Sequence, residues 1–530
     1  MPQEKDIAPD CTSSATASGH AASALPLSPS AAAAQLSASL SETAAQPASF
    51  PAAHAQPSSP TAAAAQLSGS LSETAAQPAP FPAPVPAPHT LTGEIDALRA
   101  VSKAVRDLDS LNLTQRKLFD KIEHTHNNIF IQGQAGTGKS TFIKYLKKHS
   151  KKRIRLVAPT AIAALNIEGA TIHSMFTLPL SDFLIPQEVR STRRRKLKSI
   201  LKKTDILIID EVSMLRPDIL DMIEELCCQA RGNLALFGGL QIILIGDLCQ
   251  LPPIIKPAAI PAFKQKYGTA EPYFFDALAY QKGAFEKIEL TEVYRQSDKE
   301  LLGWLQNLRN DENLPETVSY FNRRENYPPD FAATAITITP YRSVADGINR
   351  RRLAELQTPE REYEAQLAGS FEKMQDTPSP KILTIKEGAL VVFNKNNYPD
   401  YINGTSGIVE KLEDRYIVVR CLQDNKFITV RREEWKSFAY DINEETGDVT
   451  EKETGSFIQF PLQLGYALTI HKAQGKTLDR VIIDIDRGAF AHGQLYVALS
   501  RTRRKADMLI KRGLCEDDII FSERIKSFLS

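Results

Sequence analysis

The sequence predicts an α/β protein, with parallel sheets covered by helices on both faces and a small β-barrel inserted late in the chain. Short apolar runs rich in β-branched residues alternate with amphipathic stretches, as expected for buried parallel strands linked by helices. A glycine-rich phosphate-loop pattern directly follows the first of these runs. Shorter alternating strands between two later runs are typical of a small barrel. Together these three observations define the predicted fold class.

Four apolar runs predict the strands of a first α/β domain over residues 91–290. A helix precedes them, because apolar residues recur at helical spacing from Leu91 onward. The runs occupy residues 128–131, 154–157, 206–209 and 241–245. Their near-continuous apolar character indicates strands that are buried on both faces.

A second set of runs predicts a second α/β domain, formed by residues 291–380 and 460–530. Its strands are expected at residues 335–339, 463–469 and 481–485. Residues 381–459 differ, because their strands are shorter and alternate, and we assign them to the inserted barrel. The expected barrel strands are 389–393, 406–411, 416–421 and 427–431.

Residues 1–90 have a different composition from the rest of the 530-residue chain. They are rich in Ala, Ser, Pro and Gln and cannot bury enough apolar surface to offset their ordering entropy, so we predict a disordered tail. Residues 31–51 recur almost unchanged at 62–82, which we interpret as duplicated linker, since a solenoid needs three or more units. Residues 11–90 contain no Arg, which argues against a transit peptide.

Charge and cysteine content exclude several classes of protein. The net charge is +1, but the first 90 residues hold one Lys and five acids, so the remainder carries +5 and is permissive for nucleic acid. The longest mostly apolar run, residues 234–245, is well short of the roughly 20 residues of a membrane span. The six cysteines show neither C-x-x-C spacing nor a disulfide framework.

A phosphate-binding loop is the strongest functional signal. The pattern G-x-x-x-x-G-K-S stands between a predicted strand and a predicted helix, which is its proper context. Backbone N–H groups of such a loop, with the start of the helix, bind nucleotide phosphates. Lys139 is expected to reach the β and γ phosphates, and Ser140 to ligate Mg²⁺. The loop residues predicted to bind nucleotide are Gly133, Gln134, Ala135, Gly136, Thr137, Gly138, Lys139, Ser140 and Thr141.

Two acidic residues follow a buried strand, as an NTPase requires. Asp210 is expected to hold the magnesium ion together with Ser140, and Glu211 can orient and deprotonate the attacking water. A solvated turn would also carry two acids, but it is the weaker interpretation beside a phosphate loop.

Several ordered sequence strings resemble the motifs of superfamily-one helicases. They are DEVSM from Asp210, GDLCQLPP from Gly246, YRQ from Tyr294 and YVALSR from Tyr496. The strings QAR from Gln229 and FGG from Phe237 resemble the signature of the PIF family (petite integration frequency) of 5′-to-3′ DNA helicases. The resemblance covers residues 111–504, and it departs from the family at Leu236, where Pro is usual. It implies two RecA-like domains that bind ATP between them.

The resemblance implies roles for four further side chains. The Gln115 amide matches the N6/N7 edge of adenine, and Gln250 would sense the γ-phosphate. Arg295 and Arg501 would stabilise the charge that builds on the γ-phosphate during transfer. A surface Gln, a rigid turn and surface salt bridges remain the alternatives. The predicted catalytic residues are Lys139, Asp210, Glu211, Gln250, Arg295 and Arg501.

Polar residues after strand ends predict a DNA track across both domains. Hydroxyls, imidazoles and one lysine stand where a phosphate backbone could pass, and the family contacts single-stranded DNA from these motifs. The predicted contacts are Pro159, Thr160, Thr171, His173, Asn403, Thr469, His471 and Lys472. Either histidine could instead be structural, and Asn403 belongs first to an Asn-Gly turn signal.

A basic segment is predicted to lie beside the DNA entrance. Residues 190–203 carry eight positive charges and no acid, and Leu197, Ile200 and Leu201 give them one apolar helical face. We expect a basic strand-separating insertion around residues 177–204. A solvated helix and a nuclear localisation signal are the alternatives.

The sequence therefore predicts an ATP-dependent, Mg²⁺-requiring 5′-to-3′ DNA helicase that acts in replication, repair, recombination or telomere maintenance. Its polarity is implied by the resemblance alone. The expected partners are single-stranded DNA and tailed or forked duplexes, without a membrane, and the expected state is monomeric. A bacterial protein of this kind would act in the cytoplasm at the nucleoid, and a eukaryotic one in the nucleus or mitochondria.

Two alternatives remain at this point. One is a RecD-like translocase subunit of a recombination machine, and the other is an ATP-driven switch that remodels nucleic acid without unwinding. DNA-stimulated hydrolysis and unwinding separate them. A nuclease finds little support, since we identify no second carboxylate cluster for a metal.

Overall fold

The computed structural model describes residues 111–185, 194–374, 376–443 and 445–530. All of these residues belong to one compact unit. The expected tail, the helix predicted from Leu91 and part of the basic insertion, residues 186–193, lie outside the described residues. Within the described ranges, no helix has the length and apolar character needed to cross a membrane.

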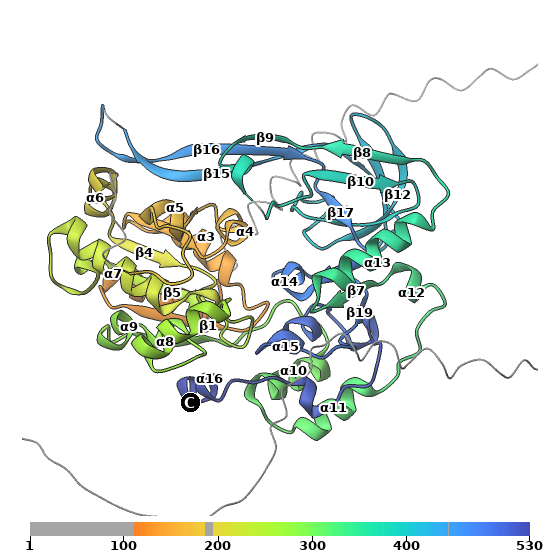
Figure 1. Ribbon diagram of the computed structural model, residues 1–530, viewed down its shortest axis with the longest axis horizontal. Helices are drawn as coiled ribbons and strands as arrows, with labels where there is room; N and C mark the ends of the chain where they lie inside the picture. The colour runs from red at the N-terminus through yellow and green to blue at the C-terminus, as the bar shows by residue number, and fades with distance from the viewer. Residues whose placement is uncertain (1–110, 186–193, 375, 444) are drawn as a thin grey trace, which may run out of the picture. The chain divides into compact units, whose positions relative to one another are not determined.

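The first sheet is parallel throughout, as predicted, and Figure 1 labels its strands β1, β4 and β5. It has six strands, because β3 and β6 join the four that were expected. Its strand order is β3-β2-β4-β5-β1-β6. The phosphate-loop strand β1 therefore lies between β5 and β6. The strands are β1 (Ile129–Gly133), β2 (Ile154–Ala158), β3 (Ala170–Thr171), β4 (Ile206–Ile209), β5 (Gln241–Gly246) and β6 (Glu286–Leu290).

Helices cover both faces of this sheet, which explains why its strands are apolar on both sides. On one face pack α2 (Leu113–His124), α3 (Lys139–His149) and α4 (Ala161–Asn166). The other face carries a second apolar cluster with side chains from α5 (Ile172–Phe176), α6 (Arg194–Lys202), α7 (Pro217–Arg231) and α9 (Leu278–Lys282). Helix α8 (Ile260–Tyr267) precedes α9 in the chain.

The second sheet is four-stranded and parallel, with the order β18-β7-β19-β20. Its strands are β7 (Ile336–Thr339), β18 (Ala467–Thr469), β19 (Val481–Ile483) and β20 (Met508–Ile510). The helices of this part are α10 (Lys299–Asn310), α11 (Leu314–Asn322), α12 (Phe331–Thr334), α13 (Arg342–Ala354), α14 (Ile470–Ala473), α15 (Gln494–Leu499) and α16 (Glu523–Leu529).

An antiparallel region is inserted between β7 and β18 and contains the four expected barrel strands. One sheet has the order β14-β13-β12-β11-β17, and a second pairs β8 with β10. Both contribute to one apolar core, which includes Tyr363, Ile385 and Phe393. The strands are β8 (Glu360–Glu364), β10 (Ile382–Lys386), β11 (Leu390–Phe393), β12 (Ser406–Leu412), β13 (Ile417–Cys421), β14 (Phe427–Val430) and β17 (Leu462–Leu464).

The single strand expected at 463–469 is wrong, because the chain forms two strands there. Residues Leu462–Leu464 pair with β11 of the barrel, whereas Ala467–Thr469 pair with β7 of the second sheet. Gly465 separates them and donates its N–H to the Leu390 carbonyl. Strand β8 also pairs with β10 from before residue 381, so the antiparallel pairing begins earlier than expected. The domain limits themselves remain a prediction.

A long hairpin connects the inserted region to the first sheet. It consists of β15 (Glu433–Ile442) and β16 (Val449–Gln459), with β9 (Gln366–Gly369) beside β16. Figure 1 shows it extending toward α6. The Tyr440 hydroxyl accepts the Leu156 N–H at 2.8 Å and contacts the Leu156 carbonyl at 3.2 Å. These groups belong to β2 just before its pairing with the short β3 begins at Val157.

The C-terminal helix α16 packs against the first sheet's aromatic cluster. The Phe528 ring stacks on Phe275 with centroids 4.2 Å apart, and Ile525 is fully buried in the same cluster. Arg524 pairs with Asp276. The end of the chain therefore joins the part that follows β6 to the first sheet.

Candidate active site

The phosphate loop adopts the backbone conformation that the sequence pattern predicts. Gly136 and Gly138 have φ values of +90° and +79°, in the left-handed region that glycine adopts without strain. The Thr137 hydroxyl donates to the Gln134 carbonyl at 2.9 Å and closes the turn. Helix α3 begins at Lys139 without a side-chain cap, so its first N–H groups are available to phosphate oxygens.

Lys139 lies folded over this loop. Its ammonium donates to the Gly133 and Gln134 carbonyls at 2.6 and 3.1 Å. Burial lowers the pKa of Lys139, while the charges of Asp247, Glu211 and Asp210 oppose that effect. The lysine can exchange these carbonyls for phosphate oxygens with a short movement of its side chain.

The acidic pair stands at the end of buried strand β4, next to the loop. Asp210 is 6% exposed, and burial, followed by the charge of Glu211, raises its pKa to about 7. Burial also raises the pKa of Glu211, whose φ of +50° is unusual outside glycine. Such strain is common where a side chain must be aimed at a site.

These residues fit a magnesium ion bound with a nucleotide. A cation beside Asp210 would favour its ionised form and offset the cost of burial. Ser140 presents an exposed hydroxyl at the start of α3. In the described ranges, no group of three or more His, Cys, Asp or Glu could form a complete protein cage. Mg²⁺ commonly binds through one or two protein ligands plus substrate phosphates.

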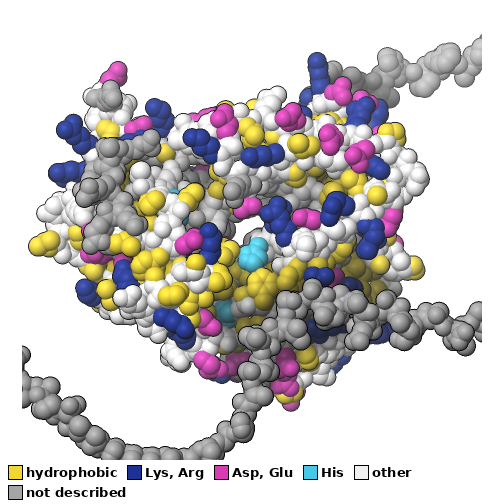
Figure 2. Space-filling model, viewed as in Figure 1, with side chains coloured by type: hydrophobic (Ala, Val, Ile, Leu, Met, Phe, Trp, Pro, Cys, Tyr) yellow, Lys and Arg dark blue, Asp and Glu magenta, His cyan; other side chains and the backbone are white. Residues whose placement is uncertain are grey.

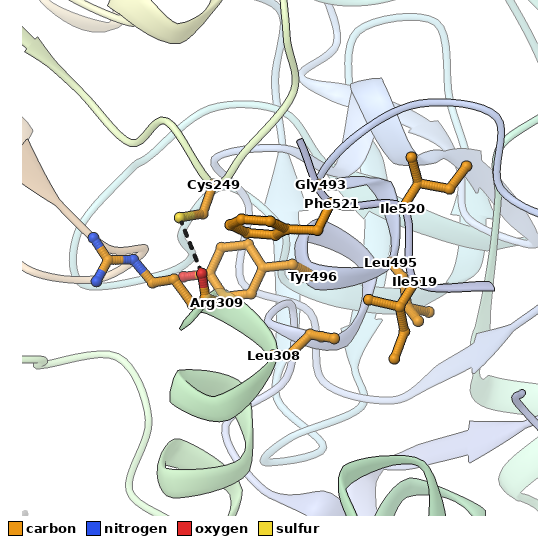
Figure 3. A pocket seen from close by; sticks show the side chains of 9 residues that line it. All are labelled: Cys249, Leu308, Arg309, Gly493, Leu495, Tyr496, Ile519, Ile520 and Phe521. Carbon is orange, nitrogen blue, oxygen red and sulfur yellow. Dashed lines mark hydrogen bonds between the residues drawn. The ribbon is translucent and has the colours of Figure 1, made fainter. Parts of the chain in front are cut away.

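Gln250 is held at the end of β5 by a buried network. Its side-chain amide donates to Asp247 at 2.8 Å, and Asp247 is fully buried. Arg309 of α10 approaches the same carboxylate at 3.7 Å. Figure 3 shows the adjoining pocket, where Cys249 and Arg309 meet Tyr496 and Phe521. The loop that carries Gln250 therefore contacts elements that follow β6. A rigid turn alone, which the sequence left as the alternative, would not require these contacts.

Arg295 packs directly on the phosphate loop. A Cβ atom on Gly136 would lie 2.5 Å from the Arg295 Cβ atom. The Arg295 Nη2 atom donates to the Gly475 carbonyl at 3.3 Å, and Nη1 is buried without a hydrogen-bond partner among the described residues. Burial lowers the pKa of Arg295. An unpaired guanidinium nitrogen beside a phosphate loop fits a γ-phosphate oxygen.

Arg501 is fully buried and held by backbone carbonyls. It donates to Val497 at 2.6 Å and to Ala473 and Lys476 at 3.3 Å. Burial, followed by the charge of Arg295, lowers the pKa of Arg501 to about 9. The surface salt bridge that the sequence left open for this arginine is therefore wrong. Arg501 fixes the loop after α14, close to Arg295 and Glu211.

Gln115 has a structural role that the sequence did not predict. It is 2% exposed, so the surface-glutamine alternative is wrong. Its Oε1 atom accepts the Asn112 N–H at 3.2 Å in a capping box, and Nε2 donates to the Thr137 carbonyl at 3.2 Å. Gln115 therefore braces the phosphate loop, and adenine binding remains a prediction for its remaining donor and acceptor sites.

The threonines of the expected DNA track all cap short helices. Thr160, Thr171 and Thr469 each accept a backbone N–H three residues later at 3.2 Å. Their hydroxyl protons remain able to donate to phosphate. Pro159 directly follows β2, and Thr171 is the last residue of the neighbouring strand β3, whereas Thr469 is the last residue of β18 in the second sheet. The structure thus groups the track on two sheets.

The two histidines of the track are half-buried, and Lys472 is exposed. Burial lowers the pKa of His173, as does the charge of Arg216, and burial lowers that of His471. Neutral imidazoles could contact DNA as hydrogen-bond donors without adding charge. Figure 2 shows histidine side chains at a hollow in the middle of this face, with both basic and acidic side chains near it.

Asn403 lies in the turn that its sequence predicts, where Gly404 has a φ of +103°. The turn contacts the second sheet's part of the chain. Lys476 donates to Asn403 Oδ1 at 2.5 Å.

The described part of the basic segment forms helix α6 and the residue after it. Lys196 and Lys203 pair with Asp441 and Asp448, which belong to the long hairpin. Part of its charge is thus neutralised by the chain itself.

Sequence reasoning missed Tyr294. Its backbone N–H donates to the Gly136 carbonyl at 2.8 Å, and its hydroxyl accepts from Asn112 at 3.0 Å. The side chain is 57% exposed beside Gly138 and Gln115. A ring in this place could stack on a nucleotide base. Its position directly before Arg295 is the signal that could have identified it.

A phosphate loop, an acidic pair and two arginines close to them, in a chain with two parallel sheets, define a P-loop NTPase. Comparison with known proteins specifies the family. Residues 110–311 match the PIF1-like helicase model, and residues 464–508 match the UvrD-like helicase C-terminal domain. The ATP-dependent DNA helicase Pif1 of Campylobacter jejuni is 30% identical over 414 residues, which cover 72% of this chain and 89% of that protein.

Solved structures agree with this match. Bacteroides Pif1 in complex with ADP-AlF4 is 33% identical, with a TM-score of 0.72 over 79% of this chain and 97% of that one. Bacteroides Pif1 bound to single-stranded DNA has a TM-score of 0.57, also at 33% identity, over 79% and 96%. The chain belongs to the PIF1-like helicase family. The predicted fold class, two RecA-like domains with an inserted small barrel, is confirmed.

Proposed function

We propose that this protein is a motor that moves 5′ to 3′ along single-stranded DNA and unwinds the duplex ahead of it. Its family membership makes it an ATP-dependent DNA helicase, an enzyme that uses ATP in genome maintenance. The observation that supports a motor best is the packing of Arg295 on Gly136, with one guanidinium nitrogen left unpaired. A γ-phosphate can occupy that position only while both parts of the chain are together.

The chemistry follows from the side chains at the loop. Lys139 would leave the Gly133 and Gln134 carbonyls for the β and γ phosphates, while Ser140 and Asp210 would hold Mg²⁺. Bound magnesium supplies charge neutralisation at the phosphates. Glu211 would take a proton from the attacking water, and Gln250 would report the state of the γ-phosphate to Arg309 through Asp247.

Arg295 and Arg501 would stabilise the charge of the transition state, as such arginines do in related enzymes. When phosphate leaves, Arg295 loses its ligand and the contact at Gly136 can open. Opening and closing of two domains that each hold the strand would move the protein along it. This converts one hydrolysis event into one step.

The proposed DNA partners are single-stranded DNA and tailed or forked duplexes. Both sheets place capping threonines at strand ends, and Lys472 is exposed beside Thr469. The 5′-to-3′ polarity comes from the family. A monomer as the active unit, the compartment and a role at telomeres remain predictions.

DNA-stimulated ATP turnover tests the proposal. We expect hydrolysis to need Mg²⁺, to rise severalfold or more with single-stranded DNA, and to be lost in Lys139→Ala and Asp210→Asn. An ion-pair control on the surface, Arg361→Ala, should hydrolyse normally. Absence of DNA stimulation in the wild-type protein would reject the motor, whereas stimulation without any unwinding would favour a RecD-like subunit or a remodelling switch.

A further inference from the structure

One short loop contacts Glu211, Arg295, Arg501 and the inserted barrel. Gln474 donates from its side chain to Glu211 at 3.4 Å. The Gly475 carbonyl accepts from Arg295, and the Lys476 carbonyl accepts from Arg501, each at 3.3 Å. We call residues 474–479 the junction loop. Each of these contacts is made with a predicted catalytic residue.

The other side of the junction loop holds the barrel turn of residues 401–406. The Thr477 carbonyl lies so close to Gly404 that a Cβ atom there would be 2.2 Å away. The Asp479 carboxylate accepts the Ser406 N–H at 3.2 Å. A backbone approach this close leaves no space for a side chain at residue 404, so this contact between the turn and the loop requires glycine there.

Lys476 is the residue whose side chain and backbone span both sides. Its ammonium donates to Asn403 at 2.5 Å and to Asn394 at 3.4 Å, while its carbonyl binds Arg501. It is half-buried, and the hydrogen-bond partners that the described chain gives its side chain are neutral amide oxygens. Placing a cation in this half-buried position costs free energy. If the contact were purely structural, an apolar residue would fill the space without that cost.

We propose that Lys476 is a positioning residue that ties the Asn403 turn to the loop held by Arg501, so that DNA on the turn and ATP hydrolysis influence each other. This inference rests on the proposed function and on the sequence prediction that Asn403 contacts single-stranded DNA. DNA that binds the turn shifts it, Lys476 follows, and the carbonyl that orients Arg501 follows with it. Loss of the lysine side chain leaves the loop backbone in place and removes only this link.

The test compares steady-state ATP hydrolysis with and without oligo-dT in Lys476→Met, Lys476→Arg and a control, Lys426→Met. Methionine keeps the length and volume of the side chain but donates no hydrogen bond. Lys426 lies on the same barrel, is exposed and forms an ion pair with nearby Asp424. Thermal melting of each variant checks the fold.

We expect Lys476→Met to keep the DNA-free rate and the KM for ATP while its DNA stimulation falls about tenfold, which is the size of one charged hydrogen bond. Lys476→Arg should restore most of the stimulation, and Lys426→Met should match wild type. Stimulation of Lys476→Met at the wild-type level would overturn the inference. So would an equal loss of the DNA-free rate, because that indicates damage to the nucleotide site.

A double-mutant cycle with Asn403→Ala gives a second readout. If Lys476 acts through Asn403, the double variant should be no worse in DNA stimulation than the more affected single variant. Additive losses would contradict the link. Failure of the proposed function is distinguishable, because the wild-type protein itself would then show no DNA stimulation.

Discussion

Gly136 and Arg295 touch across the nucleotide site with no room for a side chain between them: a Cβ atom on the glycine would lie 2.5 Å from that of the arginine. The backbone also joins them, because Tyr294 donates its N–H to the Gly136 carbonyl at 2.8 Å. The phosphate loop and the segment after β6 are therefore fitted closely to each other.

Gly136→Ala should abolish most ATP hydrolysis. Alanine at a φ of +90° is strained by about 1–2 kcal/mol, and its methyl group would displace Arg295. A misplacement of about 1 Å can reduce a rate by about 100-fold. Gly268→Ala is the matched control, since its φ is +72° and nothing lies within 4 Å of a new Cβ. It should lose stability and keep its rate; equal rates in both variants would contradict this account.

The two arginines should differ in what their removal does to the fold. Arg295→Ala should lower kcat by about 10³-fold with little change in melting temperature, because Nη1 has no partner among the described residues and Nη2 makes one long hydrogen bond, 3.3 Å to the Gly475 carbonyl. Arg501→Ala should lower kcat similarly and also lower the melting temperature, since it leaves buried carbonyls unpaired. Arg504→Ala, at an exposed ion pair, is the control. Unchanged kcat in Arg295→Ala would refute its catalytic role.

Tyr440→Phe should loosen the long hairpin from the first sheet. The change removes the Tyr440 hydroxyl, which bonds both the N–H and the carbonyl of Leu156. These groups lie where the short β3 leaves this edge of β2 unpaired. An unsatisfied buried group costs about 1–3 kcal/mol. Urea unfolding and limited proteolysis of residues 433–459 should both report the loss. Tyr416→Phe on the same inserted region should have no effect, and a similar loss there would argue against a specific contact.

DNA stimulation should fall as pH rises through about 8. Burial, followed by the charge of Lys472, lowers the pKa of Lys476 to about 8. The junction loop also contains Asp479 and bonds to the charged groups of Arg501, Arg295 and Glu211. Below pH 8 the ammonium donates strongly to Asn403, and above it the neutral amine donates weakly. Because the pKa of Lys476 lies below its ordinary value, the free energy of unfolding rises as pH rises above about 8. The hydrogen bond from Lys476 to Asn403 weakens over the same range. The ratio of wild-type to Lys476→Arg stimulation between pH 7 and 9 measures the effect, and a constant ratio would contradict it.

The sequence predicted the parts of the site that depend on local patterns. The phosphate loop and the pair Asp210 and Glu211 each follow a buried strand. Such a local pattern is compatible with few other structures, so it can be recognised in the sequence. The prediction of a single strand at 463–469 is wrong for a physical reason, because the chain changes from one sheet to the other around Gly465. Hydrophobic periodicity does not show where such a run changes its partner.

Long-range contacts could not be predicted from the sequence. Gln115 and Thr137 are 22 residues apart, and Tyr440 and Leu156 are 284 apart. No sequence pattern marks Lys476. Its contact with Asn403 exists only in the tertiary structure. Chemistry that one strand end delivers can be recognised in a sequence, whereas a contact between two loops needs the tertiary structure.

The central claim is movement from 5′ to 3′ driven by ATP. The most direct measurement compares ATP-dependent unwinding of a duplex with a 5′ single-stranded tail and the same duplex with a 3′ tail, with Lys139→Ala to exclude contaminating activity. We predict unwinding of the 5′-tailed duplex alone, lost in the variant. Unwinding of the 3′-tailed duplex in preference would contradict the assigned direction, and unwinding that survives in Lys139→Ala would contradict the nucleotide site itself.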